Sequence, residues 1–332
     1  MPNSGIATEI YSLINNEEVR PTTNLVISRC SAYDYLNNSK PNIEKLATQY
    51  YETFSITGRF TGYFSHITIG DFFNTLSAKY ADSTAILGGL NATARKEDSQ
   101  NPSNNSSSNS SSSENESSGT SNGLNSGTLS EEENIVTNPE NLEAGNSSVT
   151  GKRGTENFGL AVFNEDVLCG ELSAIESICH LLITNQLDSC IVSINNPISK
   201  EQNEKMELLV FPVKKTDVKV NIKDDKPYIS IKLSLDADIM TLDKGINYET
   251  DEVLSKISDE TKKYLNEQII NYLNKVSKEY GVDIDLFSLK GPAHFATISE
   301  WEKFNWDEKF KNAVFDVDID INVLSTMLIT KT

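Results

Sequence analysis

The last third of the chain carries the clearest pattern of apolar and polar positions. Between Asp251 and Tyr280, apolar residues recur at intervals of three, four or eight: Leu254, Ile257, Leu265, Ile269, Leu273, Val276 and Tyr280. This spacing places them along one stripe of an α-helix. Gly281 follows at the position where a left-handed residue commonly ends a helix. The pattern therefore predicts one long amphipathic helix over residues 251–280.

A strict alternation of apolar and acidic residues comes near the end of the chain. Every second residue from Phe315 to Val323 is apolar, and Asp316, Asp318 and Asp320 lie between them. A period of two predicts a β-strand with one apolar and one solvated face. A charged row on an edge strand also opposes pairing with other chains. We expect an edge strand whose aspartates face water.

Short apolar runs separated by turn residues fill residues 157–239. Ser173 and Glu176 have the spacing of a capping box, which predicts a helix running from there to about Leu182 or Thr184. Strands are predicted at Phe158–Phe163, Val167–Glu171, Cys190–Ile194, Met206–Pro212, Val218–Ile222 and Tyr228–Ile239. Because the joining turns are short, antiparallel pairing is expected. The long helix would cover one face of this sheet, and residues 315–323 would add a strand to it.

The first 95 residues show a mixed pattern. Helices are predicted at Ile6–Leu13, Ile43–Phe54 and Thr68–Tyr80, from apolar residues three or four apart. A short buried strand is predicted at Asn24–Cys30, and an edge strand within Ser83–Leu90.

Residues 96–156 differ from both flanks because they are mostly Ser and Asn over 99–129 and contain no aromatic residue there. Such a segment buries too little apolar surface to offset the entropy lost on ordering. We predict a disordered Ser/Asn-rich linker or insertion at 96–156. It would separate an incomplete N-terminal α+β domain (1–95) from a C-terminal α+β domain (157–332). The predicted class is α+β, with mostly antiparallel sheets and helices packed on one face.

Charge and cysteine content exclude several classes of function. The net charge is −19, and almost all of the acidic excess lies beyond residue 95. An acidic surface argues against nucleic-acid binding and against a polybasic membrane patch. The cysteines are Cys30, Cys169, Cys179 and Cys190, with no C-x-x-C pair, so we expect buried thiols rather than a zinc or redox site.

The sequence offers no recognisable catalytic or metal site. His66, His180 and His294 are scattered, and no zinc-hydrolase motif or phosphate-binding loop occurs. The aspartates at 283, 285, 316, 318 and 320 suggest calcium, but a calcium loop needs Gly at its sixth position and Glu at its twelfth. Counted from Asp316, these positions hold Ile321 and Met327. We predict no catalytic residue, no metal and no cofactor.

Large aromatic residues form a group before the final strand. Trp301, Trp306 and Phe310 lie within ten positions, and such residues anchor both cores and interfaces. They are candidates for either role, with the core favoured. No ligand-binding residue can be named from the sequence.

The order of these features resembles that of the Ger(x)C family, the C-subunit lipoproteins of nutrient spore-germinant receptors. Residues 159–163 (GLAVF) and 168–172 (LCGEL) resemble the opening of the family's C-terminal domain. The helix end at 280–283 (YGVD) and the spacing of Trp301, Trp306 and Phe310 are similar to later family features. Residues 18–22 (EVRPT) resemble the step from helix to strand in the N-terminal part. Phe287-Ser288 departs from the phenylalanine–glycine pair that is usual there.

This resemblance implies a non-enzymatic accessory subunit that acts by protein–protein contact. The implied partners are the A and B membrane subunits of a germinant receptor, at the outer face of the spore inner membrane. Full-length relatives reach that membrane through an N-terminal lipid anchor. No signal peptide or lipid-attachment cysteine precedes residue 18 here, so we expect a chain truncated at its N-terminus.

Two other functions are consistent with the residues. The chain could be an extracytoplasmic module that binds a small ligand between its two domains. It could also be an enzyme of unrecognised type, which would require a polar pocket with perturbed titratable groups.

Overall fold

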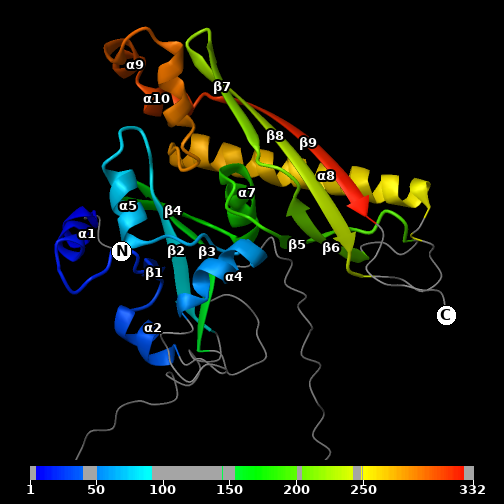
Figure 1. The fold of residues 1–332 in the computed structure, drawn as a ribbon, viewed down its shortest axis with the longest axis horizontal. Helices are drawn as coiled ribbons and strands as arrows, with labels where there is room; N and C mark the ends of the chain where they lie inside the picture. The colour runs from blue at the N-terminus through cyan, green and yellow to red at the C-terminus, as the bar shows by residue number, and fades with distance from the viewer. Residues whose placement is uncertain are drawn as a thin grey trace, which may run out of the picture.

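The structure is a computed structural model, and it describes residues 5–39, 51–91, 144, 154–199, 204–241, 248 and 250–324. They form two β-sheets with helices, which confirms the α+β class (Figure 1). Of residues 96–156, only Ala144 and 154–156 are described, so the predicted linker lies outside the described residues. The same holds for most of the helix predicted at Ile43–Phe54.

The first sheet has the strand order β1-β2-β3-β4. Its strands are β1 (Val26–Ser28), β2 (Thr84–Leu90), β3 (Thr155–Asn164) and β4 (Val167–Leu172). β2 pairs in parallel with β1 and antiparallel with β3, and β4 completes the predicted hairpin with β3. Strands from both sides of the Ser/Asn-rich segment thus share one sheet. The proposed division at residue 157 falls inside β3 and stays a prediction.

The prediction of β2 as an edge strand was wrong. β2 is an inner strand because β1 pairs with its other side at Ile86–Gly88, and every residue of β2 is buried. Gly88 allows this close packing, since a Cβ atom there would lie 2.8 Å from the Tyr35 ring and 2.9 Å from a Val26 methyl group. β1 is short and pairs with residues sixty positions later in the chain, so the sequence around β2 gives little indication of this pairing.

Helices cover both faces of the first sheet. Ala85, Leu87 and Phe163 pack in one apolar cluster with residues of α1 (Ala7–Ile14) and α5 (Ile69–Leu76). The residues on the other face of the sheet, among them Ile86 and Val162, pack in the larger apolar core together with α7 (Ala174–Thr184). The remaining described helices of the N-terminal region are α2 (Ala32–Asn38) and α4 (Phe54–Thr61).

The second sheet has the strand order β5-β6-β8-β7, and β9 pairs with β8. Its strands are β5 (Cys190–Asn195), β6 (Lys205–Pro212), β7 (Asp217–Lys223), β8 (Lys226–Ile239) and β9 (Val314–Leu324). The first four pair antiparallel, as predicted, whereas β9 runs parallel to β8 along eleven paired positions from Tyr228↔Val314 to Asp238↔Leu324. The β9 aspartates are exposed and its Ile319, Ile321 and Val323 are buried, which matches the predicted two-faced strand.

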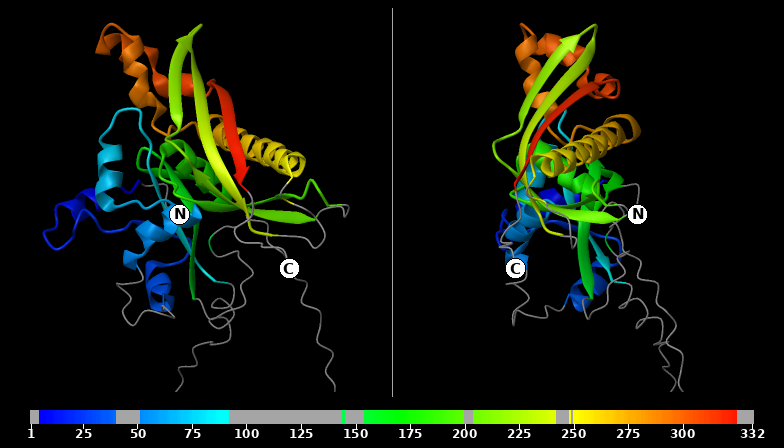
Figure 2. Two further views of the ribbon diagram at one scale, coloured as in Figure 1. Left: turned by 45° about the vertical axis from the view of Figure 1, so that its right-hand side comes forward. Right: turned by 90° about the vertical axis from the view of Figure 1, so that its right-hand side faces the viewer.

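The predicted long helix packs on the inner face of this sheet (Figure 2). It consists of α8 (Asp251–Asn274) and a final π-helical turn, η2 (Lys275–Tyr280), and ends at Gly281 with φ of 70°. Ser258 Oγ donates to Ile321 O of β9 at 2.7 Å. The predicted capping box of α7 forms, and Glu176 also accepts from Lys275 Nζ at 2.8 Å, which ties α7 to η2.

A short helical segment connects η2 to β9. It contains η3 (Phe287–His294), α9 (Ile298–Phe304) and α10 (Trp306–Phe310). These elements lie at the end of the second sheet where the β7–β8 hairpin turns (Figure 1). Their aromatic side chains close that end of the core.

Candidate functional site

The loop that follows the long helix carries two buried aspartates. Asp283 is 2% exposed, and its carboxylate accepts hydrogen bonds from Phe287 N at 3.0 Å, Ser288 N at 2.6 Å and Trp306 Nε1 at 3.0 Å. Burial raises the pKa of Asp283 to about 7, although the backbone N–H donors favour the charged form. This carboxylate fixes the turn between the loop and η3.

Asp285, two residues on, belongs to a buried three-residue network. Its Oδ1 lies 2.9 Å from His180 Nδ1, and both of its oxygens lie 2.9 Å from Tyr272 Oη. A carboxylate can only accept, so both neighbours donate to it and the His180 hydrogen lies on Nδ1. The Nε2 atom is then an acceptor. Burial, followed by the charge of Asp285, raises the pKa of Tyr272 well above 10, which keeps its hydroxyl protonated as a donor.

Asp82 connects this loop to the N-terminal region. Its two carboxylate oxygens accept from Asp283 N at 2.8 Å and from Glu165 N at 3.1 Å. Its own N–H points to Asp283 O at 3.4 Å. Burial raises the pKa of Asp82. Through these hydrogen bonds the Asp82 carboxylate connects the residues just before β2 to the loop that follows the long helix.

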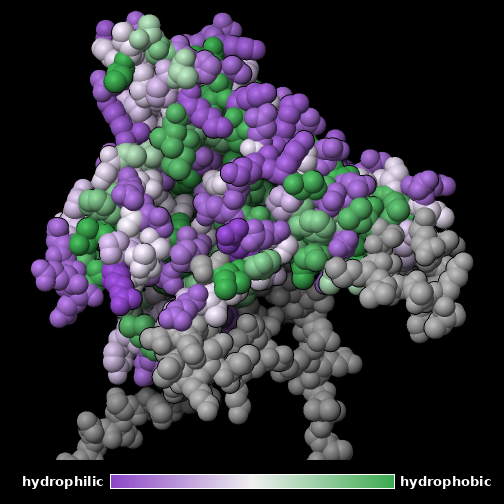
Figure 3. Space-filling model, viewed as in Figure 1, coloured by the Kyte–Doolittle hydropathy of each residue, from purple (hydrophilic) through white to green (hydrophobic). Residues whose placement is uncertain are grey.

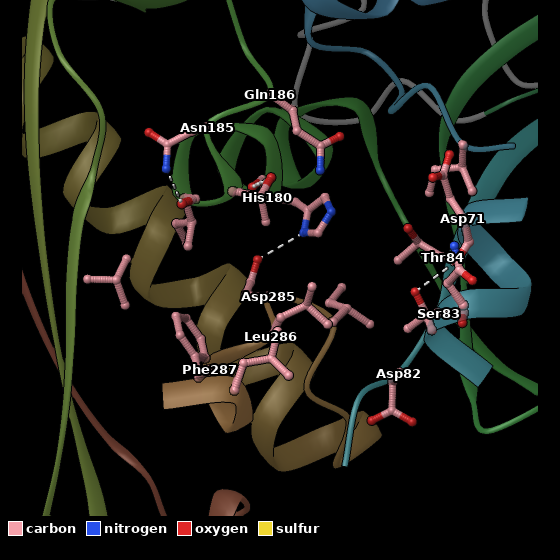
Figure 4. Close-up of a pocket in the computed structure, with 18 of the residues that line it drawn as sticks. Asp71, Asp82, Ser83, Thr84, His180, Asn185, Gln186, Asp285, Leu286 and Phe287 are labelled. Carbon is pink, nitrogen blue, oxygen red and sulfur yellow. Dashed lines mark hydrogen bonds and ion pairs between the residues drawn. The ribbon is translucent and has the colours of Figure 1, made fainter. Parts of the chain in front are cut away.

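A cleft of about 630 Å³ lies between the N-terminal region and the C-terminal part of the chain, beside these buried aspartates. One wall comes from α5 and the start of β2, and the other from the end of α7, the start of β7 and residues 284–290 (Figure 4). His180 projects between Asp285 and the open space, and Asp82 and Ser83 approach from the β2 side (Figure 4). Leu286, in the floor, has φ of 60°, a conformation that a branched side chain seldom adopts and that commonly marks functional turns.

The outer face of the second sheet is a separate feature. Most residues on this face are polar, as expected for a solvated sheet. One end differs and forms an apolar patch made of Ile191, Leu209, Phe211, Val213 and Met240. These side chains are exposed or half-buried, and Ile191 stands directly opposite Leu209 in the β5–β6 pairing. Figure 3 shows apolar residues gathered over β5 and β6.

An acidic row lies beside the apolar patch on the same face. It consists of Asp236 and Asp238 on β8 and Asp316, Asp318 and Asp320 on β9. Lys232 is the basic residue that faces this row from β8, with its Nζ 3.4 Å from Asp318. The outer face therefore joins an apolar end to an acidic row on β8 and β9.

Comparison with known proteins identifies the family of the chain. The family model described as "Spore germination B3/GerAC like, C-terminal" matches residues 158–327, more than half of the chain. The model described as "Spore germination protein N-terminal domain" matches residues 3–88. The chain belongs to the Ger(x)C family. Its members are spore-germination proteins, and the family supports a germinant-receptor subunit in general terms.

A solved structure agrees with this assignment at the level of the fold. The GerBC protein, known from its crystal structure, shares 15% identity with this Ger(x)C chain at a TM-score of 0.61, over 98% of this chain and 76% of GerBC. No curated protein sequence matches the chain. Within the described residues, no helix has the length and apolar character needed to cross a membrane.

The candidate anchor residues of this Ger(x)C chain lie in its interior. Trp306 and Phe310 are almost fully buried, and Trp301 is 7% exposed. The two tryptophan rings lie 5.5 Å apart, and Trp306 stacks on Phe310 at 5.8 Å. A direct role of these residues in partner contact stays a prediction.

The cysteines and the other acidic residues show no metal-binding arrangement within the described ranges. Cys179 and Cys190 are buried, whereas Cys30 and Cys169 are only partly buried, and all four are free thiols. Burial raises the pKa of Cys190 to about 12 and that of Cys169 to about 11, which disfavours the thiolate that binds metals.

Sequence reasoning missed the residues that line the cleft. It treated His180 as one of three scattered histidines and considered Asp285 only as a calcium ligand. One signal was available: His180 and Ser177 are the buried polar residues of an otherwise apolar helix, α7. A buried histidine needs a partner, so it indicates a polar network, but Asp285 lies more than a hundred residues away.

Proposed function

We propose that this protein is a non-enzymatic accessory subunit of a spore nutrient-germinant receptor. It acts by contact with the receptor's membrane subunits A and B, at the outer face of the spore inner membrane. The observation that carries this proposal is the match of both parts of the chain to spore-germination family models.

The outer face of the second sheet is the surface we assign to this contact. Solvated sheet faces are polar, so a group of large apolar residues there costs solubility unless a partner covers it. Phe211 is the largest side chain of the patch and lies on β6 two residues after Leu209, opposite Asp236 of β8. Buried aromatic residues surrounded by polar groups commonly dominate interface energies.

The charge beside the patch favours a protein partner over the lipid surface. The acidic row would be repelled by anionic lipid headgroups. A protein surface with an apolar centre and a basic rim would instead match both the patch and the row. We therefore assign the outer face to a membrane subunit of the receptor, with Lys or Arg residues around an apolar centre.

Affinity purification from spore membranes tests this proposal. The wild-type chain should bring down the A and B subunits, and Phe211→Asp should lose most of them because it puts a charge into the apolar centre. Ile298→Asp is the matched control, since Ile298 is also an exposed apolar residue (77%) but lies on α9, away from the patch. Equal recovery with both variants would contradict the assigned surface. No recovery of A or B with the wild type would contradict the proposed function.

A further inference from the structure

The cleft has the features of a ligand site that the proposed receptor role does not require. The strongest is Ser83, which lines the cleft and is 3% exposed. Its Oγ has no hydrogen-bond partner in the described part of the protein. A buried hydroxyl without a partner costs stability, so Ser83 would gain from a hydrogen bond to a group bound in the cleft.

His180 presents a second polar atom. Asp285 and Tyr272 hold its ring with Nδ1–H turned toward the carboxylate. In the neutral imidazole the Nε2 atom is thereby the hydrogen-bond acceptor, and no partner for it occurs within the described residues. Figure 4 shows the ring of His180 reaching from α7 toward the space between the two walls. A ligand hydroxyl could donate to Nε2, and another could accept from Ser83.

The charges around the cleft select against anions. Three carboxylates line it, those of Asp71, Asp82 and Asp285, against the single ammonium group of Lys290. Lys290 Nζ already donates to Val218 O at 2.6 Å. Asp71 lies at the exposed rim, whereas Asp285 is buried beneath His180. This arrangement favours a ligand that carries a positive charge.

We propose that the cleft binds a small organic ammonium compound that carries hydroxyl groups. The ammonium group lies toward the exposed Asp71 at the rim, and the hydroxyl groups pair with His180 Nε2 and Ser83 Oγ. The oxygens of Asp82 and Asp285 already accept hydrogen bonds within the protein, so these two carboxylates attract the ligand through their negative charge. A volume of about 630 Å³ accommodates a molecule of the size of a monosaccharide. Because the walls come from both regions of the chain, such a ligand would contact both.

Calorimetry on the purified full chain tests the proposal with D-glucosamine as the probe. D-Glucose and D-glucuronate are its neutral and anionic analogues with the same pyranose ring. At about pH 7 most of the amine is protonated, and we expect glucosamine to bind more tightly than glucose, with no binding of glucuronate. Absence of binding by glucosamine, or equal binding of all three compounds, would overturn the proposal.

Two serine variants separate binding from folding. Ser83→Ala should weaken glucosamine binding roughly tenfold, the value of one lost hydrogen bond. Its melting temperature should be unchanged or higher, because the removed hydroxyl has no partner. Ser288→Ala is the matched control: Ser288 is also a buried serine (2% exposed), but it does not line the cleft. Unchanged binding by Ser83→Ala, or an equal loss in Ser288→Ala, would refute the site. Since no other subunit is present, this outcome is independent of receptor assembly.

Discussion

Replacement of Trp306 by Phe tests whether the buried Asp283 is held as an ion by its N–H donors. The change keeps an aromatic ring but removes the Nε1–H that lies 3.0 Å from Asp283 Oδ2. A hydrogen bond to a charged group contributes about 1.5–3 kcal/mol, and the lost ring volume adds roughly 1 kcal/mol. We expect Trp306→Phe to lower the free energy of unfolding by about 2.5–4 kcal/mol where Asp283 is ionised.

Trp301→Phe is the matched control for this change. Trp301 is 7% exposed and packs against Tyr80 and Phe304, but no hydrogen bond from its indole nitrogen occurs in the described residues. It should therefore cost only the volume term, roughly 1 kcal/mol. The difference between the two variants isolates the hydrogen bond to Asp283.

The difference should also depend on pH. The indole N–H stabilises the carboxylate, so its removal raises the pKa of Asp283 further above about 7. At about pH 5 the carboxyl group is protonated in both proteins and the difference should shrink; at about pH 8 it should be largest. Urea unfolding, followed by far-ultraviolet circular dichroism, measures the free energy of unfolding of the two variants at each pH. Equal costs for the two tryptophans, with no change between the two pH values, would refute the reasoning.

Three further predictions concern single features of the chain. Cys179 and Cys190 should stay unreactive toward a thiol reagent until the protein unfolds, because burial raises the pKa of both thiols, and labelling of the native protein followed by mass spectrometry checks this. The contribution of Asp283 to stability should fall as pH rises from about 4 to about 7, because its pKa is about 7 in the folded state against a reference value of 3.8, and Asp283→Asn should flatten that part of the stability profile. Deletion of residues 99–129 should leave the melting temperature nearly unchanged, since this Ser/Asn-rich segment has no aromatic residue and cannot bury a core, and a fall of many degrees in a thermal scan would contradict this. The deletion stops short of Ala144, which is buried in the apolar cluster with α1 and α5.

Elements with strong periodicity were predictable from the sequence. The long helix, its glycine stop and the alternating β9 all rest on side chains that repeat over many residues. The capping box of α7 was equally visible, because Ser173 and Glu176 bond to each other's backbone within one turn. Local patterns of this kind depend little on the rest of the fold.

Features that depend on distant pairing were not predictable. β2 became an inner strand only because β1 reaches it from an earlier part of the chain. The parallel direction of β9 depends on α8 and the aromatic segment carrying the chain back across the sheet before it pairs with β8. The π-helical turn at Lys275–Tyr280 has no local sequence signal that we could name.

The cleft residues could not be predicted from the sequence for the same reason, because they come from distant parts of the chain. His180, Tyr272 and Asp285 come from three elements, and no spacing rule joins them. Asp283 and Asp285 stand in an alternating run, which concealed the fact that both are buried. A buried polar residue in an apolar helix predicts that some partner exists, but only the fold shows which one.

Nutrient germination of spores tests directly whether this chain is a subunit of a germinant receptor. Spores that lack this gene, in a strain with no paralogue to replace it, should lose the response to the nutrient that its receptor senses. The wild-type gene should restore the response, and the Phe211→Asp variant should not, although it folds and accumulates normally. Unchanged nutrient germination in the deletion strain would contradict a role as a germinant-receptor subunit.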